Sequence, residues 1–423
     1  MIDFSEFMLP EQVGEDQLLA SYLVYADTRN GLKLAASLAS EQTSGTWVEV
    51  PGGEEKLLAR HAGRVVAVHE VPSYETREQR EERCFLVRIS YPWGNFGPQI
   101  PMLLTTVFGN ISMFGKIKLL DIEVPEPLAE ALPGPRFGIA GIRKLLGVEK
   151  RPLLNTMIKP SIGLTPEQGA ELLYRAATGG ADIIKDDEVL ADPEVSPFAE
   201  RLTLYLERLE QAEGETGENK LYAINVTDEP ARCLEKAEAA VQAGARAVMI
   251  NYLPAGLGLV SSLARNPGID VPILGHLDFG GALYSSPYHG ISSALLYGKL
   301  PRLAGIDLLT IPTPYGKFDL SPEKYLGIVM GLRQPLHSLR RTFPIIGGGI
   351  NQGDLPRLLG DLGPEFTIGA GGAIYGHPMG PEAGARAFRQ GIELLMQGKD
   401  FQTAEGCPEL QAALEKWGDE VDG

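Results

Sequence analysis

The sequence predicts an α/β fold with two domains: an N-terminal α+β domain of the ferredoxin-like type and a C-terminal (β/α)8 TIM barrel. Three observations support this. The chain of 423 residues is too long for one ordinary core, but a barrel of roughly 250 residues plus a smaller domain accounts for it. The second part alternates short apolar segments with amphipathic stretches, and a segment rich in proline and glycine precedes it.

The first 130 residues form the expected N-terminal domain. An alternating SYLVYAD segment and a helical pattern lie within 16–38, and residues 64–70 and 84–91 alternate like half-buried strands. Residues 124–138, VPEPLAEALPGPRFG, mark the boundary because proline and glycine interrupt regular structure. The second domain is therefore expected at 131–423.

The barrel prediction depends on eight apolar segments rich in β-branched residues. They lie at 153–159, 181–185, 221–226, 247–251, 272–276, 307–311, 343–346 and 365–368. Helical periodicity separates most of them, for example at 166–178, 230–243 and 355–362. Eight β/α units in series favour a closed parallel barrel. The alternative is an open doubly wound sheet, which usually has a glycine-rich turn after its first strand; here that turn reads KPSIGL.

Composition and charge exclude several classes of function. The net charge of −17 repels phosphate backbones and anionic lipid, so neither nucleic-acid nor membrane binding is expected. No apolar run reaches the roughly 18 residues of a membrane span, and residues 1–10 lack the pattern of a secretory signal, which predicts a cytoplasmic protein. Cys84, Cys233 and Cys407 are far apart and predict reduced thiols. An anionic substrate would need a local group of lysines and backbone N–H groups.

Polar residues gather where the predicted strands end, which is where TIM barrels place their active sites. Lys185 and Asp187 are two residues apart and face the same way, and Glu188 begins the following loop. Two carboxylates suit Mg²⁺, and a desolvated lysine can add CO₂ to form a carbamate, which supplies a third oxygen ligand. The alternative is a solvated loop with an internal ion pair.

Two further strand ends carry candidate catalytic groups. Lys159 could polarise an oxyanion or move a proton, or else pair with a nearby carboxylate. His276 could be a base, a substrate contact or a structural residue, and spacing does not decide among these.

Glycines follow the last two strands, in GGGINQG and GAGGAIYGHPMG. Their exposed N–H groups indicate a phosphate site at the position where barrels commonly have one. Tight turns are the alternative explanation for these glycines.

Read together, these segments resemble the RuBisCO large-chain superfamily along nearly the whole chain. Its phrases recur in order: SGTW at 44–47, FGN at 108–110, IKPSIGL at 158–164, GGADIIKDDE at 179–188, PYGK at 314–317 and GGAIYGHPMG at 371–380.

The resemblance implies a role for each matching residue. Lys185 would be a carbamate that binds Mg²⁺ with Asp187 and Glu188, and Lys159 would be an acid–base group. The residues that match substrate and phosphate contacts are Thr46, Trp47, Lys317, Gly348, Gly349, Gly371 and Gly372. Glu41 and Asn110 match residues that one subunit lends to its partner, which implies a homodimer with shared active sites.

Departures from RuBisCO argue against carboxylation. Ser161 and Leu277 replace a lysine and an arginine of RuBisCO, and Thr310 and Gly347 replace two anchors of the second phosphate. One phosphate site with an apolar far end, near Leu277, Leu309 and Tyr315, predicts a phosphorylated ketone with a less polar tail.

Among RuBisCO-like proteins (form IV), the segments GHLDFGGALYSSP, LLTIPTPYGK and GARAFRQGIE look most like the 2,3-diketo-5-methylthiopentyl-1-phosphate enolases of methionine salvage. Those enolases place a proposed lysine base where this chain has Asn110, and they lack a lysine at the position of Lys317. The expected reaction is Mg²⁺-dependent enolisation, with Lys159 or the Lys185 carbamate as base and His276 as a weaker candidate. Alternatives are a sugar-phosphate isomerase, a β-keto acid decarboxylase that uses Lys317, and a non-catalytic protein that binds a phosphorylated ligand.

Overall fold

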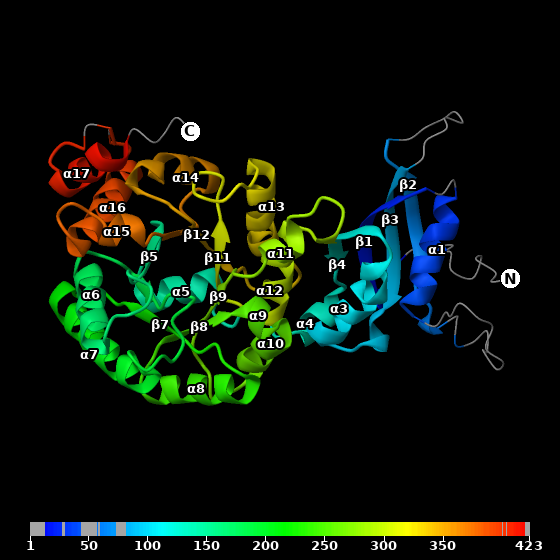
Figure 1. Ribbon diagram of the computed structural model, residues 1–423, viewed down its shortest axis with the longest axis horizontal. Helices are drawn as coiled ribbons and strands as arrows, with labels where there is room; N and C mark the ends of the chain where they lie inside the picture. Colours follow the sequence, from blue (N-terminus) through cyan, green and yellow to red (C-terminus); the bar gives the residue numbers. More distant parts are fainter. Residues whose placement is uncertain are drawn as a thin grey trace. The chain divides into compact units, whose positions relative to one another are not determined.

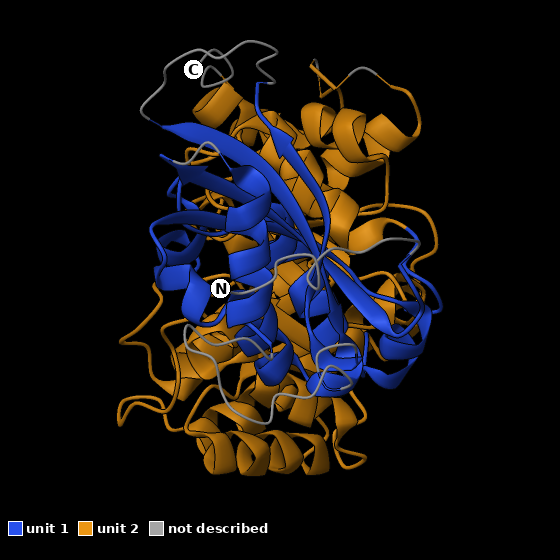
Figure 2. Cartoon of the chain, turned by 90° about the vertical axis from the view of Figure 1, so that its right-hand side faces the viewer, with its two compact units in different colours: residues 1–134, 279–304, 335–339 blue, residues 135–278, 305–334, 340–423 orange. Residues whose placement is uncertain are grey.

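The computed structural model describes residues 13–27, 30–43, 57, 60–72, 82–399, 401–402 and 404–418. The chain divides into two compact units, shown in different colours in Figure 2. Unit 1 comprises Met1–Gly134, Phe279–Ala304 and Pro335–Leu339, and unit 2 comprises Pro135–Asp278, Gly305–Gln334 and Arg340–Gly423. The division at residue 130 predicted from the sequence stays a prediction.

Unit 1 contains a five-stranded sheet with the order β10-β4-β1-β3-β2. The strands are β1 (Gln17–Ala26), β2 (Arg64–Glu70), β3 (Arg83–Pro92), β4 (Lys116–Glu123) and β10 (Gly290–Ile291). The central strand β1 pairs antiparallel with β3 and β4, whereas β10, which comes from the segment 279–304, pairs parallel with β4. The predicted strands at 64–70 and 84–91 correspond to β2 and β3.

Short helices accompany this sheet (Figure 1). They are α1 (Gly31–Glu41), η2 (Trp93–Asn95), α3 (Ile100–Phe108), η3 (Asn110–Met113), α4 (Glu126–Ala131), α11 (Gly281–Tyr284), η4 (Leu295–Lys299) and α12 (Leu300–Ala304). Tyr22 of β1 is fully buried, and its hydroxyl donates a hydrogen bond to the carbonyl oxygen of Val107 at 2.5 Å. This bond connects the sheet to the end of α3.

Unit 2 contains a closed barrel of eight parallel strands, as the sequence predicted. In barrel order the strands are β5 (Leu153–Met157), β6 (Ile183–Lys185), β7 (Leu221–Asn225), β8 (Ala247–Asn251), β9 (Ile273–His276), β11 (Leu308–Pro312), β12 (Phe343–Gly347) and β13 (Thr367–Gly369). Each strand overlaps one of the eight predicted segments, and its ends lie within two residues of the predicted ends. The agreement arises because a parallel strand buried on both faces is a short apolar run.

Helices follow the strands around the barrel (Figure 1). Those of unit 2 are α5 (Gly138–Leu146), α6 (Pro166–Thr178), α7 (Phe198–Thr216), α8 (Pro230–Gln242), α9 (Tyr252–Ala255), α10 (Leu257–Arg265), α13 (Pro322–Arg333), η5 (Gln352–Asp354), α14 (Leu355–Leu362), α15 (Gly372–Tyr375), α16 (Pro381–Met396) and α17 (Pro408–Trp417). At the start of α6, Thr165 and Gln168 form a capping box, which satisfies backbone N–H groups of the first turn. Within the described ranges no helix combines the length and apolar character that a membrane span requires.

The barrel interior explains why polar side chains meet at one end. Leu153, Ile183, Leu221 and Phe343 belong to one buried apolar cluster that includes side chains of α5. Alternate residues of a strand point to the same side. Two and four residues after Ile183, the inward positions are therefore Lys185 and Asp187, at the carboxyl end of the barrel.

Candidate active site

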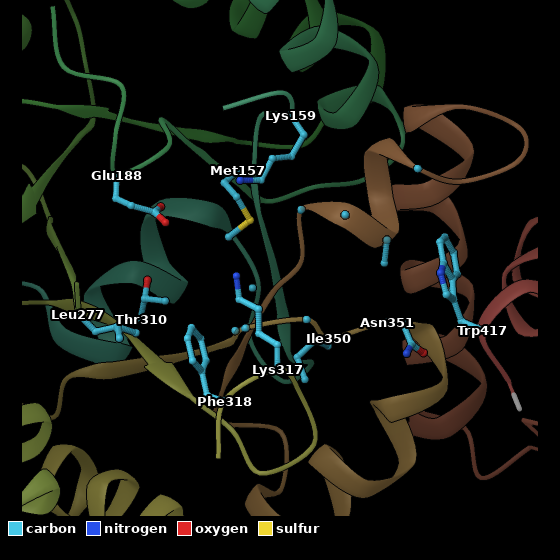
Figure 3. A pocket seen from close by; sticks show the side chains of 18 of the residues that line it. Met157, Lys159, Glu188, Leu277, Thr310, Lys317, Phe318, Ile350, Asn351 and Trp417 are labelled. Carbon is cyan, nitrogen blue, oxygen red and sulfur yellow. The ribbon is translucent and has the colours of Figure 1, made fainter. Parts of the chain in front are cut away.

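The carboxyl ends of the barrel strands surround a cavity of about 610 Å³, entirely within unit 2 (Figure 3). This volume suits a small organic ligand. Among its charged lining residues are three lysines, Lys159, Lys317 and Lys416, against one carboxylate, Glu188, with His276 beside them. Although the chain has a net charge of −17, more cationic than anionic side chains line this cavity, so it can hold an anionic ligand.

Lys159 and Asp187 form an ion pair at the mouth of the barrel. The Lys159 ammonium donates to Oδ2 of Asp187 at 2.5 Å and to the hydroxyl of Ser161 at 2.8 Å. Burial raises the pKa of Asp187, but the hydrogen bond and charge of Lys159 and the charge of Lys185 outweigh it, so the pKa lies below its usual value. The pairing of Lys159 with a carboxylate, one of the alternatives from the sequence, is present.

Lys185 is fully buried beside Glu188. Its Nζ donates to the carbonyl oxygen of Asp186 at 2.9 Å and lies 3.4 Å from Oε2 of Glu188. Burial lowers the pKa of Lys185 despite the opposing charges of Glu188 and Asp187. A buried amine with a lowered pKa is more often uncharged, which is the state that can react as a nucleophile.

Asp186 lies between these residues in sequence but faces away from them. Its fully buried carboxylate pairs with Arg201 at 3.2 Å and accepts a hydrogen bond from the Tyr222 hydroxyl at 2.7 Å. Asp186 therefore connects β6 to α7 and β7 and belongs to the outer packing of the barrel.

Two asparagines hold the loop that carries Glu188. The side-chain amides of Asn225 and Asn251 donate to the carbonyl oxygen of Glu188 at 3.3 and 2.8 Å. His276 bridges two carboxylates, with Nε2 3.3 Å from Oε2 of Glu188 and Nδ1 2.9 Å from Oδ1 of Asp278. Burial raises the pKa of Glu188, yet the charges of His276 and Lys185 outweigh it and keep the pKa below its usual value. Glu188 is therefore a fixed, ionised carboxylate.

The residues at the end of β6 fit a divalent cation with oxygen ligands. Among the described residues, no three His, Cys, Asp or Glu side chains come together as a metal-binding group. The carboxylates of Glu188 and Asp187 lie close enough to Lys185 for their charges to act on its pKa, and the charge of Asp187 also acts on the pKa of Glu188. A third oxygen ligand would come from Lys185 itself, whose burial favours the uncharged amine that a carbamate requires.

Glycines after β12 and β13 line the cavity, and at two of them a side chain would not fit. A Cβ at Gly348, whose φ is +100°, would meet the ring of Phe318 at 2.6 Å, and one at Gly371 would meet Sδ of Met157 at 2.6 Å. At Gly372 no atom lies within 4 Å of the position of an added Cβ. This space beside Gly372 leaves room for a ligand against the backbone.

The apolar end of the cavity differs in part from the prediction. Leu277 lines the cavity and Thr310 lies in the same wall, but Leu309 points away, since a Cβ on Gly275 would meet its Cδ1 at 2.9 Å. The Tyr315 hydroxyl donates to Asp361 at 2.7 Å, outside the cavity lining. Leu309 and Tyr315 therefore do not form the far end, because Leu309 is in the outward phase of β11.

The predicted residues outside unit 2 are only partly described. In unit 1, Nδ2 of Asn110 donates to Oε1 of Glu41 at 3.3 Å, so these two residues lie together. Thr46 and Trp47 lie outside the described residues.

Several residues of this site were not assigned a role from the sequence. Asp278, Phe318, Lys416 and Trp417 contact or line it, and Asn225 and Asn251 position its loop. The asparagines are polar residues at strand ends, which is a usable signal. Lys416 and Trp417 lie on a helix far along the chain, and no local pattern indicates their place.

Two family models cover most of the chain. Residues 138–417 match the model described as "Ribulose bisphosphate carboxylase large chain, catalytic domain", and residues 9–128 match its "N-terminal domain". The chain belongs to the RuBisCO large-chain family.

Individual relatives in this family agree with the assignment. The chain is 44% identical to a "Ribulose bisphosphate carboxylase-like protein" of Archaeoglobus fulgidus, covering 96% of this chain and 95% of that protein. It is 38% identical to a "2,3-diketo-5-methylthiopentyl-1-phosphate enolase" of Geobacillus thermodenitrificans, covering 95% of this chain and 98% of that protein.

Solved structures of the family have the same fold. A RuBisCO-like protein (MtnW) of Alicyclobacillus acidocaldarius matches with a TM-score of 0.89 and 34% identity over 95% of this chain and 100% of that one. A dimeric archaeal Rubisco of Hyperthermus butylicus matches with a TM-score of 0.89 and 30% identity over 98% and 99% of the two chains. This RuBisCO-like chain therefore has the same fold as another RuBisCO-like protein and as an archaeal Rubisco.

Proposed function

We propose that this chain catalyses the Mg²⁺-dependent enolisation of a small phosphorylated ketone and does not carboxylate ribulose bisphosphate. The observation that carries the proposal is the joined set of Lys159, Asp187, Lys185, Glu188 and His276 at one end of a cavity whose wall also contains the glycines of a single phosphate site. The named enolases among the relatives support 2,3-diketo-5-methylthiopentyl-1-phosphate as the first substrate to test.

Enolisation moves one proton. A base takes a hydrogen from the carbon next to the keto group, the electron pair of that C–H bond forms a C=C bond, and the keto oxygen gains negative charge before it is protonated. Lys159 and the carbamate on Lys185 are our candidates for the base, and His276 is a weaker one. Nζ of Lys159 lies 2.5 Å from Oδ2 of Asp187, and this contact fixes its position. Lys159 would have to lose a proton before its neutral amine could act as the base.

Asp187, Glu188 and the Lys185 carbamate would hold Mg²⁺, with CO₂ as the source of the carbamate. The metal supplies a positive charge that stabilises the developing oxyanion. Glu188 is held for this purpose by Asn225 and Asn251 through its backbone and by His276 through its carboxylate.

We further propose a homodimer with shared active sites. One relative is named as a dimeric Rubisco and another as an octameric Rubisco. Glu41 and Asn110, which are hydrogen-bonded to each other on unit 1, would complete the cavity of the partner subunit. Thr46 and Trp47 are proposed as substrate contacts.

Solvent deuterium exchange tests the enolisation directly. Wild-type protein with Mg²⁺ and CO₂ should exchange hydrogen of the diketo monophosphate with solvent, and chelation of the metal should abolish exchange. Lys159→Ala should abolish it as well, whereas Lys150→Ala, at the opposite end of the barrel beside Arg151, should not. Exchange that persists in Lys159→Ala removes Lys159 as base, and a wild type that exchanges nothing sinks the proposal.

The carboxylase alternative has its own test. Wild-type protein supplied with ribulose bisphosphate and labelled CO₂ should fix no acid-stable label. Fixation of label would contradict the proposed absence of carboxylation.

The position of Lys317 in the cavity favours a second candidate function, decarboxylation of a β-keto acid phosphate. Its side chain extends into the cavity wall beside Phe318, with Nζ 5.2 Å from the ring centroid, and an ammonium there could hold the departing carboxylate. Release of CO₂ from such a substrate, with no exchange into the diketone, would favour decarboxylation over enolisation.

A further inference from the structure

The last helix of unit 2 brings a lysine and an aromatic ring into the wall of the cavity. Lys416 and Trp417, at the end of α17, line the same cavity as Gly371 and Gly372. In Figure 3, Trp417 and Glu188 lie on opposite sides of the view, with the Lys317 side chain between them. The cavity therefore has an end formed by α17 that is separate from the Glu188 end.

Specific contacts hold α17 in this place. The backbone N–H of Leu410 donates to Oε1 of Gln390 at 3.0 Å, and the same glutamine donates to Glu409 at 2.7 Å. Arg386 on the neighbouring helix α16 also pairs with Glu409, at 3.2 Å. These bonds fix α17 against α16, so the position of its last turn is defined.

The Lys416 ammonium is tied to the glycine segment itself. Its Nζ donates to the carbonyl oxygen of Gly376 at 2.6 Å, and Gly376 directly follows α15, which begins at Gly372. An ammonium has three N–H donors, so this bond leaves donors for a ligand. The Trp417 ring centroid lies 5.0 Å from the same Nζ, which restricts where the lysine side chain can move.

We propose that Lys416 binds the phosphate group of the substrate and that Trp417 closes this end of the cavity, which makes the C-terminal helix part of the phosphate site. The proposal rests on the proposed function for the nature of the ligand, a phosphate monoester. Lys416 would add a cation beside the backbone N–H groups of Gly371 and Gly372, and charge-assisted hydrogen bonds are stronger than neutral ones. In this proposal the ring of Trp417 would limit the site to a terminal phosphate and exclude a larger ester group.

Binding of inorganic phosphate, followed by calorimetry, tests the assignment without depending on catalysis. Lys416→Gln should weaken phosphate binding roughly five- to tenfold, since one charge-assisted bond is lost at an exposed position. Lys416→Arg should recover most of the affinity because the charge and donors return. Lys399→Gln, a matched loss of charge just after α16 and outside the cavity lining, should leave the affinity unchanged.

Substitution of Trp417 tests the closure of the cavity. The wild type and Trp417→Phe should exclude a small phosphate diester such as dimethyl phosphate. Trp417→Ala should bind it. Equal phosphate affinity in wild type and Lys416→Gln, or absence of phosphate binding in the wild type, would overturn the role of Lys416. Exclusion of the diester by Trp417→Ala would overturn the role of Trp417.

The result of these binding experiments can be distinguished from the result of the exchange experiment that tests the proposed function. If the wild type binds phosphate through Lys416 but exchanges no hydrogen of the diketone, the phosphate site stands and enolisation fails. If the wild type exchanges hydrogen while Lys416→Gln binds phosphate as tightly as the wild type, enolisation stands and the site proposed for α17 fails.

Discussion

Asp186 and Asp187 are adjacent in the chain but form ion pairs on opposite sides of the barrel wall. Asp186 pairs with Arg201 in a fully buried position, whereas Asp187 pairs with Lys159 at the mouth of the barrel. The alternation of side chains along an extended segment separates them. One carboxylate therefore supports the packing of α7, and the other is available for chemistry.

Substitution should separate these two roles. Asp186→Asn leaves the Arg201 charge buried without its partner, so the free energy of unfolding should fall by about 3–5 kcal/mol, measured by urea denaturation. Asp187→Asn should leave unfolding much less affected and slow deuterium exchange by roughly 100-fold or more. An Asp187→Asn protein that exchanges as fast as wild type, or an Asp186→Asn protein of unchanged stability, would contradict this division.

A second buried carboxylate, Asp307, predicts a pH dependence of stability. It accepts hydrogen bonds from the backbone N–H groups of Phe137, Gly138 and Ile273 at 2.6, 2.9 and 3.0 Å. Burial raises the pKa of Asp307 to about 6 despite these three bonds. The folded protein therefore holds this proton more tightly than the unfolded chain, whose aspartates have a pKa of about 3.9.

The sign of the effect follows from that order of pKa values. The stabilisation from the bound proton is complete below about pH 4 and is lost as the pH rises through about 6. The unfolding free energy of wild type minus that of Asp307→Asn, measured by urea denaturation, should fall between pH 4 and 7 by up to about 3 kcal/mol. A difference that rises over this range would mean that Asp307 is ionised throughout.

Most of the fold could be predicted because its signals are local. Each barrel strand is a short apolar run between helical patterns, and the boundaries of α6 and α14 agree with the predicted 166–178 and 355–362. Segment 279–304 was different. It lies between two barrel strands in sequence, yet its strand β10 pairs with β4 of unit 1, and a two-residue strand has no periodicity to reveal it.

The candidate site was predictable where strand ends alone define it. Lys159 pairs with Asp187, and Lys185 and His276 both lie beside Glu188, although the roles of these residues stay predictions. Leu309 differs from the prediction because it occupies an outward position of β11 and packs outside the cavity. Lys416 reaches the cavity only through the packing of α17 on α16, and such long-range contacts leave no mark in the local sequence.

Asp278 should orient His276. Its carboxylate lies 2.9 Å from Nδ1 of His276 and can accept a hydrogen bond from it, which turns Nε2 toward Glu188, 3.3 Å away. Asp278→Asn should lower the rate of deuterium exchange about three- to tenfold, because the imidazole loses the carboxylate that orients it. Asp270→Asn, at an exposed carboxylate paired with Arg136, is the control. An unchanged exchange rate in Asp278→Asn would contradict the role of Asp278 in orienting His276.

Gly371 and Gly372 are adjacent in the chain but have different surroundings. A methyl group on Gly371 would lie 2.6 Å from Sδ of Met157 and 3.3 Å from Cε of Lys159, so Gly371→Ala must displace side chains inside the barrel mouth. This overpacking should cost about 1–3 kcal/mol of unfolding free energy and also disturb Lys159.

A methyl group on Gly372 meets no atom within 4 Å. Gly372→Ala should therefore keep the unfolding free energy within about 0.5 kcal/mol of wild type, yet its methyl group would occupy space where a phosphate approaches the backbone. We expect Gly372→Ala to raise the KM for a phosphorylated ketone at least tenfold with little change in kcat, and Gly371→Ala to lower kcat as well. If Gly372→Ala binds inorganic phosphate as tightly as wild type, the phosphate does not approach this part of the glycine segment, and the glycines there serve the turn alone.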